Sequence, residues 1–143
     1  MKDRTPLPKQ CFIDSNIWLY ALNKRQDEHK HAVANQLVRA KGFIVSTQVI
    51  NEVCSNLVKK ASFSQAQTVV VVKAFYQRCH VISFDRDILL KAGALREQYQ
   101  ISFWDSLIVS SALSTEAKIL YSEDMNSSLV IEKKLTIINP LSV

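Results

Sequence analysis

Residues 10–22 read QCFIDSNIWLYAL, and this stretch decides the expected fold. Residues 10–13 form a short apolar run that fits a buried strand. Asp14, Ser15 and Asn16 then cap a helical pattern that continues through Leu22. The stretch therefore predicts a strand that leads directly into a helix, with an acidic residue at the junction.

The rest of the chain repeats this alternation. Further strands are expected at residues 43–46, 80–83, 118–121 and 136–138, and further helices at residues 27–40, 47–60, 64–77, 85–99 and 102–114. The β-branched run 69–72 favours a strand, but Ser64 and Gln67 form a capping box and the flanking apolar residues keep helical spacing. Strands that alternate with helices predict an α/β fold, with a mostly parallel sheet flanked by helices.

Length and composition narrow the class of protein. The 143 residues fit a single domain over 1–143, and 48% hydrophobic residues can form a core. Only Gly42 and Gly93 are present, which excludes a glycine-rich phosphate loop. Three cysteines without metal-type spacing, a charged N-terminus and no apolar run of about 20 residues predict a cytoplasmic protein that does not enter membranes.

Four acids mark the ends of predicted strands or lie early in helices: Asp14 in FIDSNIWLYAL, Glu52 in STQVINEVCSNL, Asp105 in ISFWDSLIVSSAL and Asp124 in ILYSEDMN. Each is surrounded by apolar residues, where an unpaired carboxylate is costly. A bound cation would make such a cluster tolerable, and oxygen ligands favour Mg²⁺ or Mn²⁺. The carboxyl ends of parallel strands meet at one sheet edge, so we expect the acids to gather there.

Each acid also has an ordinary interpretation. Asp14 suits a helix cap, Asp105 belongs to a capping-box pattern with Ser102, Asp124 suits a turn, and Glu52 suits an exposed helical position. Taken together, these interpretations account for the four acids less well than they do for each acid alone. Glu52 lies on the apolar side of its helix, and Asp105 follows Trp104 in a helix with few polar residues.

A metal held by these acids would suit phosphodiester hydrolysis by an activated water. Asn16 and Ser122 are candidates to position a carboxylate or a phosphate. The net charge of +5 fits either a polyanionic substrate or a need for solubility. Lys24, Arg25, Lys59 and Arg86 lie near predicted element ends and are candidates to bind an RNA backbone.

The four acidic segments, with the closing IINPL, together resemble the PIN-domain ribonucleases, and within them the VapC-type toxins of bacterial toxin–antitoxin pairs. The likeness runs in order from about Cys11 to Leu141, and it is the combination of motifs that makes it specific. The resemblance implies a Rossmann-like PIN fold and Mg²⁺- or Mn²⁺-dependent endonucleolytic cleavage of RNA. Asp14, Glu52, Asp105 and Asp124 match the acidic quartet, and Asn16 and Ser122 match its accompanying polar residues.

The resemblance also implies a homodimer and a cognate antitoxin that covers the active site with a helix and an extended tail. Apolar residues that flank the first two acids can either form core or meet such a helix: Trp18, Leu19, Leu22, Val49, Ile50, Val53 and Leu57. An Arg in the partner's tail would be attracted to the acids. One departure is the segment Asn126–Ser127–Ser128, where relatives often have a glycine-containing turn.

Two other functions stay open at this point. One is a PIN-domain nuclease of RNA processing or decay that works without an antitoxin. The other is a catalytically weak RNA-binding module, against which the complete acidic quartet argues. A dehalogenase-like phosphatase fits poorly, because Asp14–Ser15–Asn16 lacks the second Asp that follows the nucleophile in those enzymes.

Overall fold

The computed structural model describes residues 5–142, so residues 1–4 of the charged N-terminal segment and residue 143 lie outside the described residues. The strands are β1 (Cys11–Ile13), β2 (Ile44–Ser46), β3 (His80–Ile82), β4 (Ile119–Tyr121), β5 (Val130–Ile131) and β6 (Leu135–Ile138). The helices are α1 (Ser15–Leu22), α2 (Glu28–Leu37), α3 (Thr47–Ala61), α4 (Gln65–Arg78), α5 (Arg86–Tyr99) and α6 (Phe103–Leu113), and a 3-10 turn, η1 (Pro8–Gln10), precedes β1.

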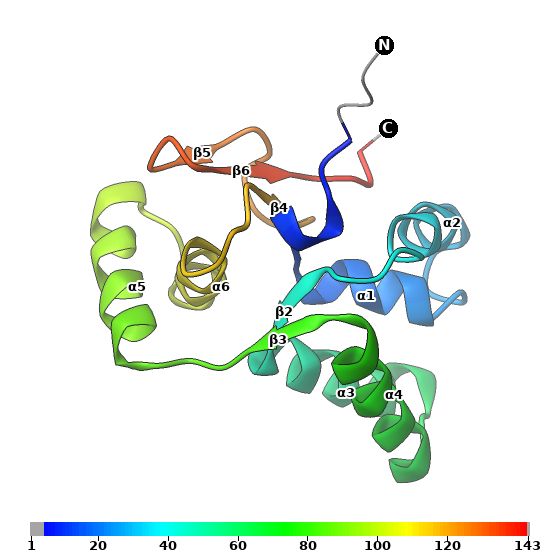
Figure 1. Cartoon of the computed structure of the whole chain (residues 1–143). Helices are drawn as coiled ribbons and strands as arrows, with labels where there is room; N and C mark the ends of the chain where they lie inside the picture. The colour runs from blue at the N-terminus through cyan, green and yellow to red at the C-terminus, as the bar shows by residue number, and fades with distance from the viewer. Residues whose placement is uncertain (1–4, 143) are drawn as a thin grey trace.

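The strands form one sheet in the order β3-β2-β1-β4-β6-β5. Neighbouring strands from β3 to β6 are parallel, and only the pair of β5 and β6 is antiparallel. In Figure 1, α5 and α6 lie on one side of the strands and α1 and α2 on the other, while α3 and α4 form a helical hairpin below. The predicted α/β architecture with a mostly parallel, helix-flanked sheet is confirmed.

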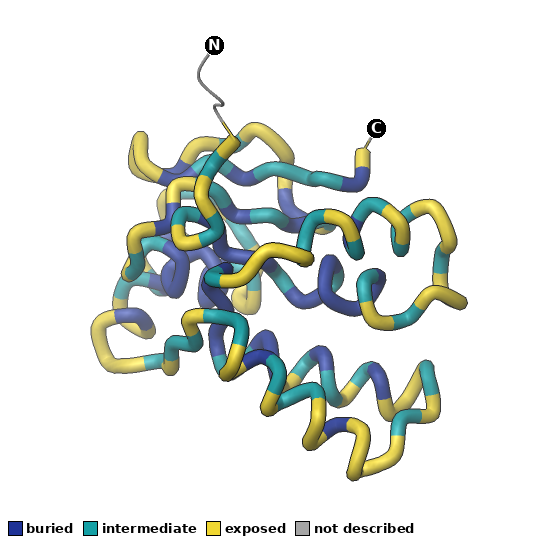
Figure 2. Tube along the Cα trace, turned by 45° about the vertical axis from the view of Figure 1, so that its right-hand side comes forward, coloured by how far each residue is buried: buried dark blue, intermediate teal, exposed yellow. Residues whose placement is uncertain are grey.

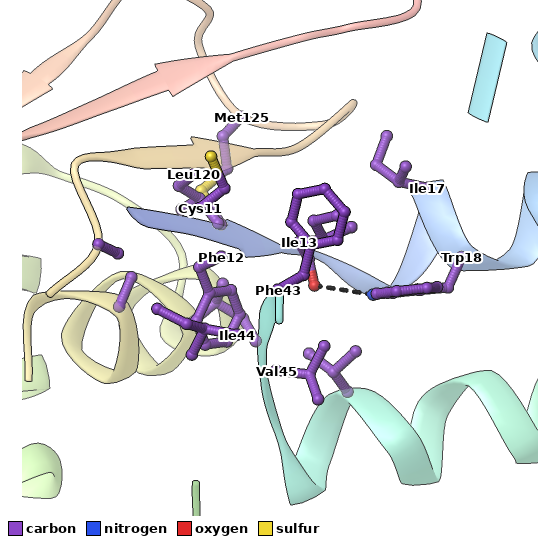
Figure 3. Packing of buried hydrophobic residues seen from close by; sticks show 14 of the residues in the cluster. Cys11, Phe12, Ile13, Ile17, Trp18, Phe43, Ile44, Val45, Leu120 and Met125 are labelled. Carbon is purple, nitrogen blue, oxygen red and sulfur yellow. Dashed lines mark hydrogen bonds between the residues drawn. The ribbon is translucent and has the colours of Figure 1, made fainter. Parts of the chain in front are cut away.

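The core is centred on β1, where all three side chains are buried. Phe12 and Ile13 are fully inaccessible and pack among residues of β2, β4 and α1 (Figure 3). The indole Nε1 of Trp18 donates to the backbone oxygen of Ile13 at 3.2 Å, which fastens α1 to the end of β1. Buried residues follow the strands and the inner faces of the helices, and exposed residues occupy the outer turns (Figure 2).

Side-chain caps set most helix starts where the sequence predicts them. Asp14, Asp27, Ser46, Asp85 and Ser102 each accept a hydrogen bond from a backbone amide in the first turn of the following helix. The capping box of α4 is complete, since Ser64 and Gln67 bond to each other's backbone amides. The run 69–72 is helical as predicted, because the cap and the apolar spacing outweigh the strand preference of valine.

Two details differ from the prediction. The second helix ends at Leu37 rather than residue 40, and the chain then turns through Gly42, whose φ of +102° favours glycine. Strand β5 is missing from the prediction; it pairs with β6 through a turn at Glu132 and Lys133, both left-handed. Within residues 5–142, no helix is long and apolar enough to cross a membrane.

Candidate active site

Two neighbouring parallel strands bring Asp14 and Ser122 together. Ile13 of β1 lies opposite Tyr121 of β4, so the residues that follow both strands leave the sheet at the same edge. The backbone amide of Asp14 donates to the Tyr121 carbonyl at 3.0 Å, and the Ser122 hydroxyl donates to Asp14 Oδ2 at 3.1 Å. Ser122 is fully buried, so its hydroxyl sets the orientation of the Asp14 carboxylate.

Ser15 links the first two acids. Its backbone amide donates to Asp14 Oδ1 at 2.7 Å, and its hydroxyl donates to Glu52 Oε2 at 2.8 Å. The other oxygen of Glu52 accepts from Gln48 Nε2 at 2.9 Å, one helical turn earlier in α3. The sequence predicted only a helix-capping role for Ser15 and no role for Gln48. For Ser15 the only signal is its position between Asp14 and Asn16, and for Gln48 it is the four-residue spacing to Glu52.

The fourth acid is held by Asn16, whose amide Nδ2 donates to Asp124 Oδ2 at 2.6 Å. Asp105 lies in the first turn of α6, where Ser102 Oγ accepts from its backbone amide. All four acids line one small cleft of 160 Å³. The residues around this cleft are Asp14, Ser15, Asn16, Glu52, Asn56, Trp104, Asp105, Ile108 and Asp124.

The acids are less buried than their apolar sequence neighbours suggest. Asp14, Glu52 and Asp105 are half-buried, and Asp124 is exposed. The expectation that every acid is embedded in apolar surroundings is therefore wrong for Asp124. The chain leaves the sheet after Tyr121, and in the turn that follows it is Met125 that points into the core, at 6% exposure.

Negative charge accumulates in the cleft. Desolvation raises the pKa of Asp14 from 3.8 to about 6; hydrogen bonds from Ser15 and Ser122 oppose this rise, and the charges of Glu52 and Asp105 add to it. The pKa of Asp105 is also raised, mainly by desolvation and further by the charges of Asp124 and Glu52. The ion pairs among residues 5–142 are Lys30–Glu123, Arg86–Asp87 and Lys91–Glu132, none of which includes a cleft acid. The cleft therefore favours a cation.

The donor set fits a hard divalent ion, because every strong ligand in the cleft is an oxygen. Within the described part of the chain, however, no three His, Cys, Asp or Glu side chains are placed to enclose a metal ion. Oxygens of Asp14 and Glu52 point to hydroxyl and amide donors instead. This arrangement suits Mg²⁺, which usually keeps several waters and takes only one or two carboxylates from the protein.

A second network holds the loop that carries Asp124. The carboxylate of its neighbour Glu123 accepts from Tyr20 Oη at 2.9 Å and pairs with Lys30 Nζ at 2.6 Å. Lys30 also lies over the Tyr20 ring, 5.0 Å from its centroid. Glu123 thus ties the turn after β4 to both α1 and α2, and this clamp fixes where Asp124 stands.

We expect Lys30→Met to weaken the site without unfolding the protein. Loss of the ammonium frees Glu123 and lets Asp124 move, which should lower the affinity of the cleft for a divalent ion by about 10-fold, the lower end for residues that support metal ligands. The measurement is the melting temperature as a function of Mg²⁺ or Mn²⁺ concentration. Lys91→Met is the matched control, because Lys91 pairs with Glu132 away from the cleft. Equal metal dependence in both variants would show that the clamp has no role in the site.

The four predicted RNA-binding cations do not line the cleft. Lys24, Arg25 and Lys59 are exposed, in the turn after α1 and in the last turn of α3. Arg86 begins α5, next to Asp87. This end of α5 packs on the C-terminal part of α6, since Ser110 Oγ donates to the Ile88 carbonyl, whereas Asp105 lies at the N-terminal end of α6. The structure therefore separates Arg86 from the acids.

A second, larger hollow lies between α1, α2 and α4. It has a volume of 410 Å³ and is lined mainly by apolar side chains, and Arg39 and Arg78 are also among its lining residues. Trp18 and Leu22 contribute to it, and Leu22 is exposed. We call it the apolar groove, and its full lining is Trp18, Ala21, Leu22, Asn35, Val38, Arg39, Val70, Val71, Ala74, Phe75, Arg78 and Cys79.

The apolar residues of α3, in contrast, are not accessible to a partner. Val49, Ile50, Val53 and Leu57 are all buried in the core at 4% exposure or less. Leu19 is buried as well, at 6%. Of the two interpretations of these residues, core packing is correct, because α3 turns that face toward the sheet and α1.

Comparison with known proteins identifies one family and several solved structures with a similar fold. The chain matches the family model described as PIN domain over residues 11–130. No curated protein matches it. Several solved structures share its fold.

One is the VapC20 toxin of Mycobacterium tuberculosis, described as cleaving the sarcin–ricin loop, with 18% identity, a TM-score of 0.66, and coverage of 80% of this chain and 89% of that one. A second is a toxin–antitoxin complex from Klebsiella pneumoniae, with 19% identity, a TM-score of 0.68, and coverage of 91% and 97%. A third is VapBC2 of Rickettsia felis bound to a promoter DNA fragment, with 22% identity, a TM-score of 0.57, and coverage of 80% and 87%.

Proposed function

Because the chain belongs to the PIN domain family, we propose that it is a divalent-metal-dependent endoribonuclease and the toxin of a type II toxin–antitoxin pair. One observation carries the nuclease proposal: four acids from four separate segments line a single cleft at the carboxyl edge of the sheet. The toxin and toxin–antitoxin structures that share the fold support the toxin role.

In this proposal Asp14, Glu52, Asp105 and Asp124 together hold Mg²⁺ or Mn²⁺, one or two of them directly and the others through the waters that such an ion keeps. When bound, such an ion polarises a phosphodiester and lowers the pKa of a water molecule, so that hydrolysis needs no protein nucleophile. The polar neighbours position the ligands: Ser122 orients Asp14, Ser15 orients Glu52, and Asn16 orients Asp124. A phosphate that enters the cleft brings negative charge to a group of acids, so the cation assists binding as well as chemistry.

We expect metal to stabilise the protein and EDTA to stop cleavage. An ion that binds only the folded state adds about 2.7 kcal/mol to the free energy of unfolding at 100 times its dissociation constant. The measurement is the melting temperature in EDTA, Mg²⁺ and Mn²⁺, together with RNA cleavage in each. Asp14→Asn is the control, and its melting temperature should respond much less to metal. Full cleavage in excess EDTA would contradict the metal mechanism.

The proposed antitoxin has a place to bind in the apolar groove. An amphipathic helix would cover its apolar lining, and an acidic residue on that helix would meet Arg39 and Arg78, which are joined by a 2.7 Å hydrogen bond from Arg78 Nη2 to the Arg39 carbonyl. The extended tail of the same partner would carry an Arg to the acidic cleft and compete with metal there. We also propose that the nuclease works as a homodimer.

Brief induction in cells tests the function. The expected result is growth arrest, relieved when a small protein from the adjacent gene is co-expressed and copurifies with the chain. Sequencing of RNA 5′ ends would reveal new cleavage sites in wild-type cells that are absent with Asp14→Asn. New 5′ ends without arrest and without a binding neighbour would favour the alternative, a PIN-domain nuclease of RNA processing or decay. No new ends at all would overturn the nuclease proposal.

A further inference from the structure

Two adjacent aromatic side chains stand exposed at the start of α6. Phe103 is 55% exposed and Trp104 is 64% exposed, whereas Trp18, the only other tryptophan in the sequence, is 8% exposed. Exposed apolar rings of this size cost solvation free energy, because the hydrophobic effect favours their burial. A pair at one position therefore indicates that something covers it during function.

The two rings are held in place rather than left free. They meet edge to face, with centroids 5.4 Å apart and planes at 76°. The guanidinium of Arg96 lies 4.2 Å from the Phe103 ring centroid, and its Nη1 donates to Ser106 Oγ at 2.8 Å. Ser106 Oγ in turn donates to the Phe103 carbonyl at 2.6 Å. Because these contacts already restrict the rings, a ligand that binds the face of Trp104 has less side-chain entropy to remove.

Trp104 is also part of the acidic cleft. It lines the cleft beside Asp105, the next residue in the chain, together with the other three acids. The cleft is otherwise bordered mainly by carboxylates, amides and a hydroxyl, and Ile108 is its only aliphatic lining residue among those described. A helix of a protein partner would place apolar side chains over unpaired acids there, which is costly. A nucleobase suits the position better, because it has a flat face for the indole and polar edges for water and amides.

We propose that Trp104, braced by Phe103 and Arg96, is the stacking platform for one unpaired nucleobase next to the phosphodiester held in the acidic cleft. The inference rests on the proposed nuclease function and deepens it by naming the residue that would contact the base of an unpaired nucleotide. Bases inside a duplex are covered on both faces by their neighbours, so only an unstacked base reaches the indole. Stacking of this kind tolerates any base, so the platform selects for strandedness rather than for sequence.

The test is binding of short RNA in the Asp14→Asn background, which keeps the RNA intact. The probes are an oligouridylate of about a dozen nucleotides, within the range that single-strand sites cover, and a blunt duplex of mixed sequence. Trp104→Leu should weaken single-strand binding by about 5- to 150-fold, the affinity equivalent of about 1–3 kcal/mol of stacking per base. Duplex binding should be weaker at the outset and should change little. Trp104→Phe should retain most of the single-strand affinity, since it keeps an aromatic face.

Indole fluorescence gives a second readout. The oligouridylate should quench the emission in the Asp14→Asn background, and the quenching should vanish with Trp104→Phe, which leaves only the buried Trp18. Tyr76→Ala is the matched control, because Tyr76 is an equally exposed aromatic residue on α4, at 57%, that does not line the cleft. It should leave both affinity and quenching unchanged.

Three outcomes would overturn the platform. The first is a Trp104→Leu variant that binds the oligouridylate as tightly as its parent. The second is a duplex that competes equally with the single strand. The third is an emission that changes with protein concentration alone, since this would assign the rings to contact between copies. If the wild type cleaves RNA while any of these is seen, only the platform is wrong; if it neither binds nor cleaves RNA, the proposed function fails as well.

Discussion

Asp14→Asn should reduce RNA cleavage by at least about 100-fold, the upper value seen when even a residue behind a metal ligand is changed. The amide has nearly the shape of the carboxylate, so the hydrogen bonds from Ser15 and Ser122 can be kept in part. What is lost is a negative charge at the centre of the acidic cleft. The measurement is the initial cleavage rate of a labelled RNA at saturating Mg²⁺.

Asp85→Asn is the matched control for this variant. Asp85 also precedes a helix and caps it, by accepting from the Ile88 amide at 2.8 Å, and an Asn cap is nearly as good. Asp85 does not line the acidic cleft. Its variant should cleave RNA like the wild type. If both variants kept full activity, the acids would have to be assigned to folding rather than to catalysis.

The same substitution of Asp14 should make the metal-free protein more stable at neutral pH. The pKa of Asp14 is about 6 in the folded state and 3.8 in a model peptide. Between these pH values the folded protein keeps a proton that the unfolded chain has released, so the free energy of unfolding falls as the pH rises from about 4 to about 6. Each pKa unit corresponds to about 1.4 kcal/mol, so the ionised wild type is destabilised by about 3 kcal/mol at pH 7.

The amide in the Asp14→Asn variant cannot ionise, and the variant therefore escapes this loss. Chemical denaturation in EDTA should show the variant more stable by about 3 kcal/mol at pH 7, with the difference shrinking toward pH 4. Saturating Mg²⁺ should favour the wild type again, because the ion binds the carboxylate form. A stability difference that is the same at pH 4 and pH 7 would mean that the Asp14 carboxylate is not strained by its surroundings.

Local signals explain why most elements were predictable. Each helix start carries a capping residue, and the capping box at Ser64 was strong enough to override the valine run that follows it. Strand β5 had no such signal. It has two residues, it exists through pairing with β6, and its turn uses Glu132 and Lys133 at left-handed φ, where the usual glycine or asparagine is missing.

For the site, strand and helix geometry predicted where the acids lie but not which side chains orient them. Because parallel strands end at a common edge, residues after β1 and β4 had to be neighbours, and the early turns of α3 and α6 lean over the same edge. The bonds that orient the acids depend on side chains far apart in sequence, such as Ser15 with Glu52 and Tyr20 with Glu123. The distance in sequence between two such residues does not indicate that their side chains will form a hydrogen bond.

The conformation of the turn after Asp124 also could not be predicted from the sequence. The family resemblance favours a glycine in this segment, whereas this chain has Ser128 at a φ of +71°, with its amide bonded to the Ile137 carbonyl at 2.6 Å. The backbone adopts a glycine-like conformation without a glycine. Its shape is therefore maintained by tertiary hydrogen bonds, which sequence pattern alone does not reveal.

The place of β1 in the sheet has a consequence for synthesis of the chain on the ribosome. β1 is made first, yet one of its two neighbours is β4, and the bond that orients Asp14 comes from Ser122, which is 108 residues away. At 5–20 residues per second, roughly 5 to 20 s separate the translation of these two residues. A nascent chain that has not reached Ser122 also lacks Asp124, and its β1 has an unpaired edge. The acidic cleft is thus completed only after residues 122–124 have been made, so a shorter nascent chain lacks two of the side chains that the proposed nuclease needs.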